Sequence, residues 1–389
     1  MRILFQNRRD HNLVRGGDTI QIESTKNALE KKYNIKVDIS TELNPNLENY
    51  DIVHLFNITR VHETYQQLIN AKKQNVLVVV TPIYHDLEAI YNYEKYGRNG
   101  IVKVLNTLIN NQTHREFLKN IAKIIKQKDF KQTSSVIKQL FMGYENQQKY
   151  VIENSDFIFP LAPSEIKKME KQLRINKELK FEITTNGIES DSLYYSKDRQ
   201  IIDTIQKYNL NNIDLKKYVI CVGRIEPRKN QIALIKALES TDIGVIFVGG
   251  INTKLISYYK EFIKLIDNNK YIYLGKVNHD EMMDLYNIVN TSVLPSWFEV
   301  TSLVDLEAAI NGLNIVTTKY SYMYDYFGEN AIYCDPKSLE SIRESVKLAI
   351  NKSENTNNVV ISNSKLQEYT WENVADILYN SYLNILKLK

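Results

Sequence analysis

Residues 294–312, LPSWFEVTSLVDLEAAING, carry the pattern that decides the fold. The apolar residues up to Leu294 predict the end of a buried strand, and Leu303, Leu306 and Ile310 recur at helical spacing. A short polar and aromatic loop with Glu299 separates the two. We therefore predict a strand, a loop and a helix, with the loop at the carboxyl end of the strand, where open α/β sheets place their ligands.

The predicted helix has a recognisable start. Ser302 followed three residues later by Asp305 fits a capping box, which gives Asp305 a structural role. Glu299 and Glu307 have no such role, so both are candidates for a site. The first turn of a helix offers unpaired N–H groups and a partial positive charge, and it therefore suits a phosphate group.

The rest of the chain alternates strands with helices, which is typical of parallel sheets in an α/β fold. Two such blocks flank a polar stretch at 191–215 and predict two Rossmann-like domains that face each other across a cleft. A final amphipathic helix begins near Trp371, with Thr370 as its cap. The predicted strands are 2–7, 37–39, 51–56, 75–82, 156–161 and 181–185 in the first block, and 218–222, 244–249, 271–274, 291–294, 314–318 and 331–334 in the second.

Composition sets the broad class. A chain of 389 residues is long for one core, and 43% hydrophobic with 25% charged residues is ordinary for a globular protein. The net charge of +4 gives no case for nucleic acid. Cys221 and Cys334 lie inside predicted strands and read as buried thiols of a reducing compartment. Neither a signal peptide nor an apolar run of membrane length is visible, so we expect a cytoplasmic protein.

A second motif, VICVGRIEPRKNQ at 219–231, leaves a predicted buried strand with Arg224 and Lys229 at its exit. Two cations beside a helix start suit a diphosphate, since they supply charge where a leaving phosphate gains it. The alternative is a pair of surface cations. Gly16 and Gly17 follow the first strand; they allow either close approach to a phosphate or a tight turn.

Residues 115–149 are helical by periodicity and basic. They contain eight Lys or Arg against three acidic residues, an excess of five. One interpretation is a solvated helical face, and the other is peripheral contact with an anionic membrane or an acidic acceptor.

Taken together, these motifs resemble the retaining glycosyltransferases of family 4, which have two Rossmann-like domains in the GT-B arrangement. The resemblance covers essentially the whole chain. Its pieces, in order, are Gly16-Gly17, DIVHLFN at 51–57, TPIYHD at 81–86, NGIE at 186–189, VGRIEPRKN at 222–230, FVGG at 247–250, YLGKV at 273–277, and Glu299 with Glu307 eight residues later.

The resemblance implies domains at 1–196 for the acceptor, at 197–368 for the nucleotide sugar, and a crossover helix at 369–389 that packs on the first domain. It implies that Arg224 and Lys229 hold the diphosphate, Glu307 the ribose and Glu299 the donor sugar, with His85 near the transferred sugar. The implied catalytic residues are Glu299 and His85; the implied donor-binding residues are Gly16, Gly17, Arg224, Lys229, Val277, Thr301, Ser302, Leu303 and Glu307.

Two departures from the family pattern bear on the site. Val300, Thr301 and Ser302 stand where many members have Gly-Phe-Gly, so the sugar preference cannot be carried over. The spacing of TPIYHD is also unusual, which leaves Tyr84 or Asp86 as alternatives to His85. The alternative role for His85 itself is a structural one at the start of a helix, with Asp86 as the cap.

No two aspartates stand at i and i+2, so the Asp-x-Asp metal motif of other glycosyltransferases is missing and we expect no metal and no cofactor. The predicted function is transfer of a sugar from a nucleotide-diphosphate sugar, UDP-linked in preference to GDP-linked, to a hydroxyl acceptor in cell-surface glycan or glycolipid synthesis. The alternatives are a protein O-glycosyltransferase, its non-catalytic partner subunit and, less favoured, a nucleotide-sugar epimerase. A nicotinamide-dependent dehydrogenase is set aside because the chain has no Gly-x-Gly-x-x-Gly.

Overall fold

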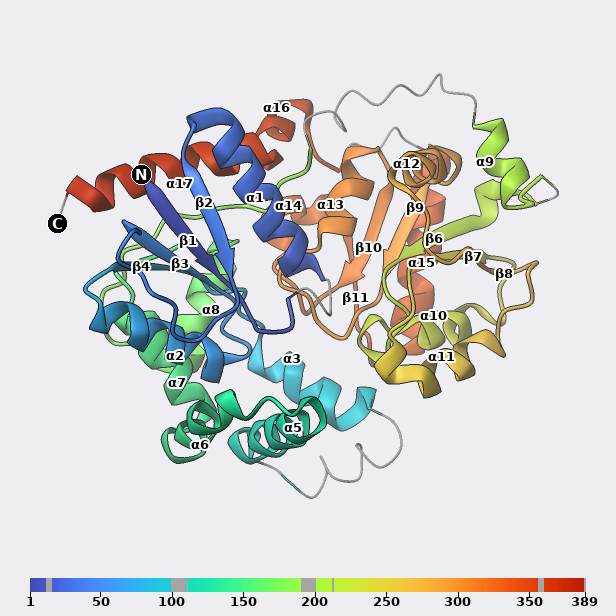
Figure 1. Ribbon diagram of the computed structural model, residues 1–389. Helices are drawn as coiled ribbons and strands as arrows, with labels where there is room; N and C mark the ends of the chain where they lie inside the picture. The colour runs from blue at the N-terminus through green and yellow to red at the C-terminus, as the bar shows by residue number, and fades with distance from the viewer. Residues whose placement is uncertain are drawn as a thin grey trace. The chain divides into compact units, whose positions relative to one another are not determined.

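The computed structural model describes residues 1–11, 16–98, 109, 111–189, 201–211, 213–355 and 360–387 (Figure 1). The chain divides into two compact units. The first comprises residues 1–87, 100–187 and 368–389, and the second comprises 88–99 and 188–367. Each unit is built on one parallel sheet, as the alternation of strands and helices predicts.

The sheet of the first unit has five strands in the order β2-β1-β3-β4-β5, all parallel. Its core is mostly aliphatic, with the buried rings of Tyr84 and Tyr144 among the aliphatic side chains. Every residue of the central strand β3 is buried, as expected for a strand covered on both faces. The bounds are β1 Arg2–Gln6, β2 Lys36–Ser40, β3 Ile52–Phe56, β4 Leu77–Thr81 and β5 Phe157–Ile158.

The predicted strands at the end of this block are wrong in extent. β5 has two residues, and 181–185 forms no strand beyond a single bridge from Phe181 to Ile158. Pro160 gives the physical reason, because it has no N–H to donate and so interrupts the ladder that both segments would need.

Helices cover the first sheet. Their bounds are α1 Gly17–Tyr33, α2 Val61–Lys73, α5 Gln112–Gln127, α6 Thr133–Met142, α7 Tyr144–Asn154 and α8 Pro163–Leu173, with a short 3-10 turn, η2, at Phe130–Gln132. The region predicted as helical and basic is thus α5 to α7, and most of 99–110 lies outside the described residues.

The last helix, α17 (Trp371–Lys387), packs along α1 in the first unit, which confirms the predicted crossover helix (Figure 1). Thr370 caps it by accepting a hydrogen bond from the N–H of Asn373 at 3.2 Å. Deep in the unit, the hydroxyl of Tyr382 lies 2.6 Å from Nδ1 of His54 on β3. Desolvation by burial lowers the pKa of His54 to about 3.

The second unit has a six-stranded parallel sheet in the order β11-β10-β9-β6-β7-β8. The order reverses between β6 and β9, and this topological switch point is where doubly wound sheets bind ligands. The predicted thiols are confirmed as free and buried, Cys221 on β6 and Cys334 on β11. The strands are β6 Tyr218–Val222, β7 Gly244–Val248, β8 Tyr271–Tyr273, β9 Thr291–Leu294, β10 Asn314–Thr318 and β11 Ile332–Cys334.

The elements around this sheet are mostly helices. They are α9 Ile202–Lys207, α10 Gln231–Leu238, α11 Ile256–Ile263, α12 His279–Ile288, α13 Leu303–Ile310, α14 Tyr324–Phe327, α15 Leu339–Asn355 and α16 Asn363–Leu366. Short turns are η4 Leu215–Lys217, η5 Pro227–Lys229, η6 Thr253–Leu255, η7 Gly328–Asn330 and η8 Gln367–Tyr369. Part of the predicted linker is therefore helix α9; 190–200 lies outside the described residues.

A segment from the first half of the sequence completes the second unit. Helix α3 (Leu87–Asn92) and the π-helical turn η1 (Tyr93–Gly97) bring Ala89 and Tyr93 into a small apolar cluster with Trp297 and Phe298. The contact is close, since a Cβ at Gly97 would lie 2.7 Å from the Trp297 ring. Nothing in the sequence pattern indicated that residues 88–99 belong to the second unit.

None of the helices in the described part of the chain is long and apolar enough to cross a membrane.

Candidate active site

The candidate site lies at the switch point of the second sheet, where the loops after β6 and β9 meet. The loop after β6 carries Arg224 and the turn η5, and the loop after β9 carries Glu299. Trp297 donates its backbone N–H to the carbonyl of Arg228 at 2.8 Å, so the two loops are joined directly. The loops that carry the two sequence motifs are therefore neighbours at this edge of the sheet.

Glu299 lies between two cations. Its Oε1 atom is 2.7 Å from Nζ of Lys229 and 2.9 Å from a guanidinium nitrogen of Arg228. Burial alone would raise the pKa of this carboxyl, but Arg228 and then Lys229 outweigh it and hold the pKa well below its usual range. Glu299 is therefore a fixed carboxylate at neutral pH.

Arg228 is the residue that sequence reasoning missed. Besides Glu299, its guanidinium contacts Glu226 at 3.4 Å and donates to the carbonyl of Phe298 at 3.1 Å. It also lies 5.6 Å from the centre of the Phe298 ring. The only sequence signal for a role of Arg228 is its position beside Lys229 in EPRKN, and the sequence prediction named Lys229 alone.

Arg224 remains a candidate for the diphosphate. Its side chain is 34% exposed, and it pairs with Glu226 at 3.3 Å. Two glycines bring its loop against the next one: a Cβ at Gly249 would lie 2.1 Å from the carbonyl oxygen of Gly223, and Gly249 has a φ of 143°. The glycines of VGR and FVGG therefore serve close packing of the loops after β6 and β7.

Of the capping box predicted at the start of α13, only the contribution of Ser302 is confirmed. Ser302 is the N-cap and accepts from the N–H of Asp305 at 3.2 Å. Asp305 does not complete a capping box; its carboxylate instead accepts from the Thr317 hydroxyl on β10 at 2.7 Å. Burial raises the pKa of Asp305 to about 7. The first N–H groups of α13, near Thr301 and Leu303, lie where a helix has no acceptor of its own.

Glu307 occupies the second turn of α13, in the same helix that Ser302 caps. Burial raises the pKa of its carboxyl to about 7. Val277, predicted to contact the base, follows β8 in a half-buried loop that turns at Gly275, where φ is 73°. A positive φ of this size suits glycine.

Gly16 and Gly17 lie in the first unit at the start of α1. Gly16 is the N-cap in an extended conformation, and neither residue has a positive φ. A Cβ at Gly17 would meet no atom within 4 Å. The backbone therefore does not require glycine at 17, so its open side is available for close approach of another group.

His85 also lies in the first unit, after β4. Ile83 just before it has a φ of 49°, a conformation that costs energy for a β-branched residue and is found mostly at functional sites. The two alternatives to His85 have internal contacts: the hydroxyl of Tyr84 donates to Gln172 at 2.9 Å, and Asp86 lies 2.6 Å from Lys168. His85 is half-buried and stays a prediction, with Tyr84 and Asp86 as its alternatives.

Among the residues that the structure describes, no group of three His, Cys, Asp or Glu could hold a metal ion.

Comparisons with known proteins find similarity to glycosyltransferases. Residues 203–367 match the family described as glycosyl transferases group 1. An uncharacterized glycosyltransferase of Methanocaldococcus jannaschii is 26% identical over 179 residues, 43% of this chain and 45% of that protein. The O-antigen chain mannosyltransferase B of Escherichia coli is 22% identical over 191 residues, 47% of this chain and 49% of that one. The chain thus spans about half the length of the curated relatives it matches.

Solved structures match over the whole chain. A sucrose-phosphate synthase from Thermosynechococcus elongatus has a TM-score of 0.69 at 13% identity and covers 100% of both chains. The HepE protein of Anabaena, in complex with UDP and glucose, has a TM-score of 0.67 at 14% identity and covers 98% of this chain and 99% of its own. At such identities the likeness concerns the fold alone, which is GT-B with two Rossmann-like sheets. The family model adds that residues 203–367, within the second unit, are similar to the group 1 glycosyl transferases.

Proposed function

We propose that this protein is a retaining glycosyltransferase that moves a sugar from a nucleotide-diphosphate sugar to a hydroxyl acceptor. The observation that carries the proposal is the meeting of Glu299, Lys229 and Arg228 at the switch point of the second sheet, with Arg224 on the same loop. Cations at this position can neutralise a leaving diphosphate without a metal ion.

During the reaction, Lys229 would contact both Glu299 and the donor diphosphate. In this structure it is bound to Glu299 at 2.7 Å, while Arg228 holds the same carboxylate oxygen. A donor diphosphate brings at least two negative charges and would attract Lys229 and Arg224. Because Arg228 remains, Glu299 would keep its charge and stay oriented toward the hydroxyls of the donor sugar.

The remaining residues would divide the donor between them. Glu307 would accept hydrogen bonds from the ribose hydroxyls, and the loop with Val277 would face the base. The N–H groups at Thr301 and Leu303 would meet the phosphate or the sugar. The N–H of Ser302 donates to Sδ of Met323 at 3.0 Å in this structure and would have to exchange that partner to join them. From the first unit, Gly16 and Gly17 would approach the diphosphate and His85 the transferred sugar.

In the proposed step, the bond from the anomeric carbon to the phosphate oxygen breaks and its electrons go to the diphosphate. The acceptor oxygen bonds to the anomeric carbon on the same face, and its proton passes to a phosphate oxygen. Glu299 forms no bond to the sugar, since a carboxylate held by two cations is a weak nucleophile. Trapping of a glycosyl group on Glu299, detected by mass spectrometry, would overturn this step.

UDP is the favoured nucleotide and GDP the second. The Anabaena HepE structures contain UDP, glucose or UDP-glucose, whereas the Escherichia coli relative is named a mannosyltransferase of the O-antigen chain. The second name also supports an acceptor in cell-surface glycan or glycolipid synthesis.

The surface of α5, η2 and α6 supports a location at the inner face of the membrane. Large apolar side chains are exposed there, with Ile125 63%, Phe130 65% and Phe141 85% accessible. Lysines accompany them on the same elements, at 119, 126, 128, 131 and 138. Two of the eight cations of 115–149 face inwards, because Arg115 is buried and Lys123 lies 3.4 Å from Asp10. Exposed apolar side chains and lysines on the same stretch of chain fit an anionic bilayer better than a purely solvated face.

Flotation with liposomes tests this surface. The protein should float with anionic vesicles at low salt, much less with zwitterionic ones, and the double variant Phe130→Ser, Phe141→Ser should stay at the bottom. Tyr324→Ser removes an aromatic side chain that is also more than half exposed, in the second unit, and should float like the parent protein. If the parent protein fails to bind anionic vesicles at low salt, the surface has another role.

A donor screen tests the function itself. UDP-, GDP- and ADP-sugars are compared for the thermal stabilisation they give, and the stabilising donor is then incubated with candidate glycan and lipid-linked acceptors. We expect one nucleotide to raise Tm and the Arg224→Ala variant to lose that shift. Isomerised donor without acceptor would indicate an epimerase. If no nucleotide sugar stabilised the protein, a non-catalytic partner subunit would be indicated instead.

A further inference from the structure

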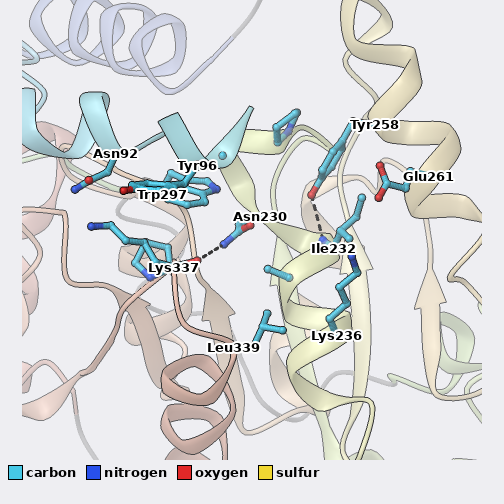
Figure 2. A pocket seen from close by; sticks show the side chains of 14 residues that line it. Asn92, Tyr96, Asn230, Ile232, Lys236, Tyr258, Glu261, Trp297, Lys337 and Leu339 are labelled. Carbon is cyan, nitrogen blue, oxygen red and sulfur yellow. Dashed lines mark hydrogen bonds between the residues drawn. The ribbon is translucent and has the colours of Figure 1, made fainter. Parts of the chain in front are cut away.

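A cavity of about 620 Å³ lies in the second unit, beside the start of α10 (Figure 2). Its size is that of an ordinary small-molecule site. None of the residues predicted to bind the nucleotide sugar lines it. It is nonetheless formed by neighbours of that site: Pro227 and Asn230 flank Lys229 closely, and Trp297 precedes Glu299 by two residues.

One side of the cavity is aromatic. The ring of Tyr96, which is 50% exposed, and the indole of Trp297 lie together there, and the ammonium of Lys337 is 5.8 Å from the centre of the Tyr96 ring (Figure 2). Asn92 lies beside them. Its side chain is only 7% exposed, and its Nδ2 has no hydrogen-bond partner in the described part of the chain. A buried amide without a partner is costly unless something else satisfies it.

The opposite side is polar. Glu261 and Lys236 are exposed there, and Tyr258 lies beside Glu261 (Figure 2). The Tyr258 hydroxyl accepts the N–H of Ile232, in the first turn of α10, at 3.1 Å. That hydrogen bond uses one of the N–H groups that would otherwise attract an anion. Lys236 and Lys337 share the lining of the cavity with the carboxylate of Glu261.

We propose that this cavity is a second, nucleotide-independent site that binds a neutral oligosaccharide. A pyranose has an apolar face of C–H groups, which suits the half-exposed ring of Tyr96; Trp297 lies beside that ring but is only 6% exposed. A pyranose also has a rim of hydroxyls that both donate and accept. The amide of Asn92, the carboxylate of Glu261 and the ammonium of Lys236 supply both kinds of partner. An anionic ligand such as phosphate would gain little, because the cations are exposed and a carboxylate faces them. The proposal goes beyond the proposed function and does not rest on it.

Saturation-transfer NMR with the full-length protein tests the proposal. The probes are neutral trisaccharides of glucose, mannose and N-acetylglucosamine, each with and without excess UDP, and inorganic phosphate as an anionic competitor. We expect at least one trisaccharide to bind, UDP and phosphate to leave that binding in place, and Tyr96→Ala to weaken it about tenfold. Asn92→Leu should weaken it as well, because the amide is lost at similar volume.

Tyr324→Ala is the matched control, since Tyr324 is an exposed tyrosine of the same unit outside the cavity, and it should bind as the parent protein does. Unchanged thermal unfolding of Tyr96→Ala shows that the variant is folded; Lys236→Ala provides a second exposed position if it is not. The proposal is overturned if no trisaccharide binds, if UDP or phosphate displaces the bound one, or if the Tyr96 and Lys236 variants both bind normally.

Discussion

Arg228 joins two loops through one guanidinium, which touches the carboxylates of Glu226 and Glu299 and the carbonyl of Phe298. Arg228→Met would leave both carboxylates with one cation fewer in a largely buried setting. Removing one partner of such a network costs about 3 kcal/mol. We therefore expect a clear fall in Tm by calorimetry, together with weaker donor binding.

Lys217→Met is the control for that experiment. Lys217 pairs with Asp242 at 3.0 Å, but both side chains are more than half exposed, so the substitution should leave Tm where it was. Equal effects of the two substitutions would show that Arg228 does not hold the Glu299 loop.

Glu307 gives a pH dependence with a definite sign. Burial raises the pKa of its carboxyl to about 7, so the group is charged at pH 8 and mostly protonated at pH 6. A carboxylate accepts two hydroxyls of a ribose better than the protonated acid does. The Kd of the nucleotide, measured by calorimetric titration, should rise by up to about tenfold from pH 8 to pH 6.

The variant Glu307→Gln separates this effect from the titration of the phosphate itself. It should bind more weakly at pH 8 and lose most of the change between pH 8 and pH 6. The same slope in the variant and the parent protein would place the titrating group elsewhere.

For individual side chains of the candidate site, the sequence was informative where a residue type has one chemical use. Lys229 and Glu299 were chosen from two separate motifs, and they are 2.7 Å apart. Asp305 was read as half of a capping box, but its carboxylate turns to Thr317, a contact across 12 positions that no local pattern contains. Arg228 was overlooked because an arginine next to a lysine does not reveal which of the two faces inward.

At the scale of elements, α17 is attached to the first sheet by one buried polar contact, from Tyr382 to His54 at 2.6 Å. Tyr382→Phe keeps the ring and removes the hydroxyl, so Nδ1 of His54 would lose its partner. Such a loss costs about 1 to 3 kcal/mol. We expect a lower midpoint in urea with an unchanged slope.

Tyr324→Phe is the corresponding control, since the Tyr324 hydroxyl bonds Glu329 at the surface. An unchanged midpoint for Tyr382→Phe would mean that the hydrogen bond to His54 adds nothing to the docking of α17.

Most strands and helices follow from periodicity, because burial of one face repeats along each element. The start of α17 at Trp371, with Thr370 as its cap, was predicted from the sequence and is confirmed. The prediction of a strand at 181–185 is wrong, because its neighbour β5 ends at Ile158 and Pro160, two residues later, has no N–H to extend the ladder. The position of α3 and η1 could not be predicted at all, since it depends on an apolar cluster with Trp297, about two hundred residues later.

At the scale of the whole molecule, the proposed chemistry uses side chains where other glycosyltransferases use a metal ion. Arg224 and Lys229 would take up the charge of the leaving diphosphate. Transfer from the stabilising donor should therefore proceed equally with excess EDTA and with added Mg²⁺ or Mn²⁺, as measured by nucleotide release. A loss of activity in EDTA that Mg²⁺ restores would contradict this mechanism.

The segment at 88–99 has a practical consequence for work on the separate halves. The chain enters the second unit at 88, leaves it at 99, returns at 188 and departs again at 367. A gene fragment that begins at 188 would therefore encode most of the second unit without the residues that cover Trp297 and Phe298, and it should be poorly soluble. During synthesis, Tyr93 leaves the ribosome long before Trp297 and Phe298 have been made. Co-expression of a peptide with the sequence of 88–99 should rescue the isolated fragment.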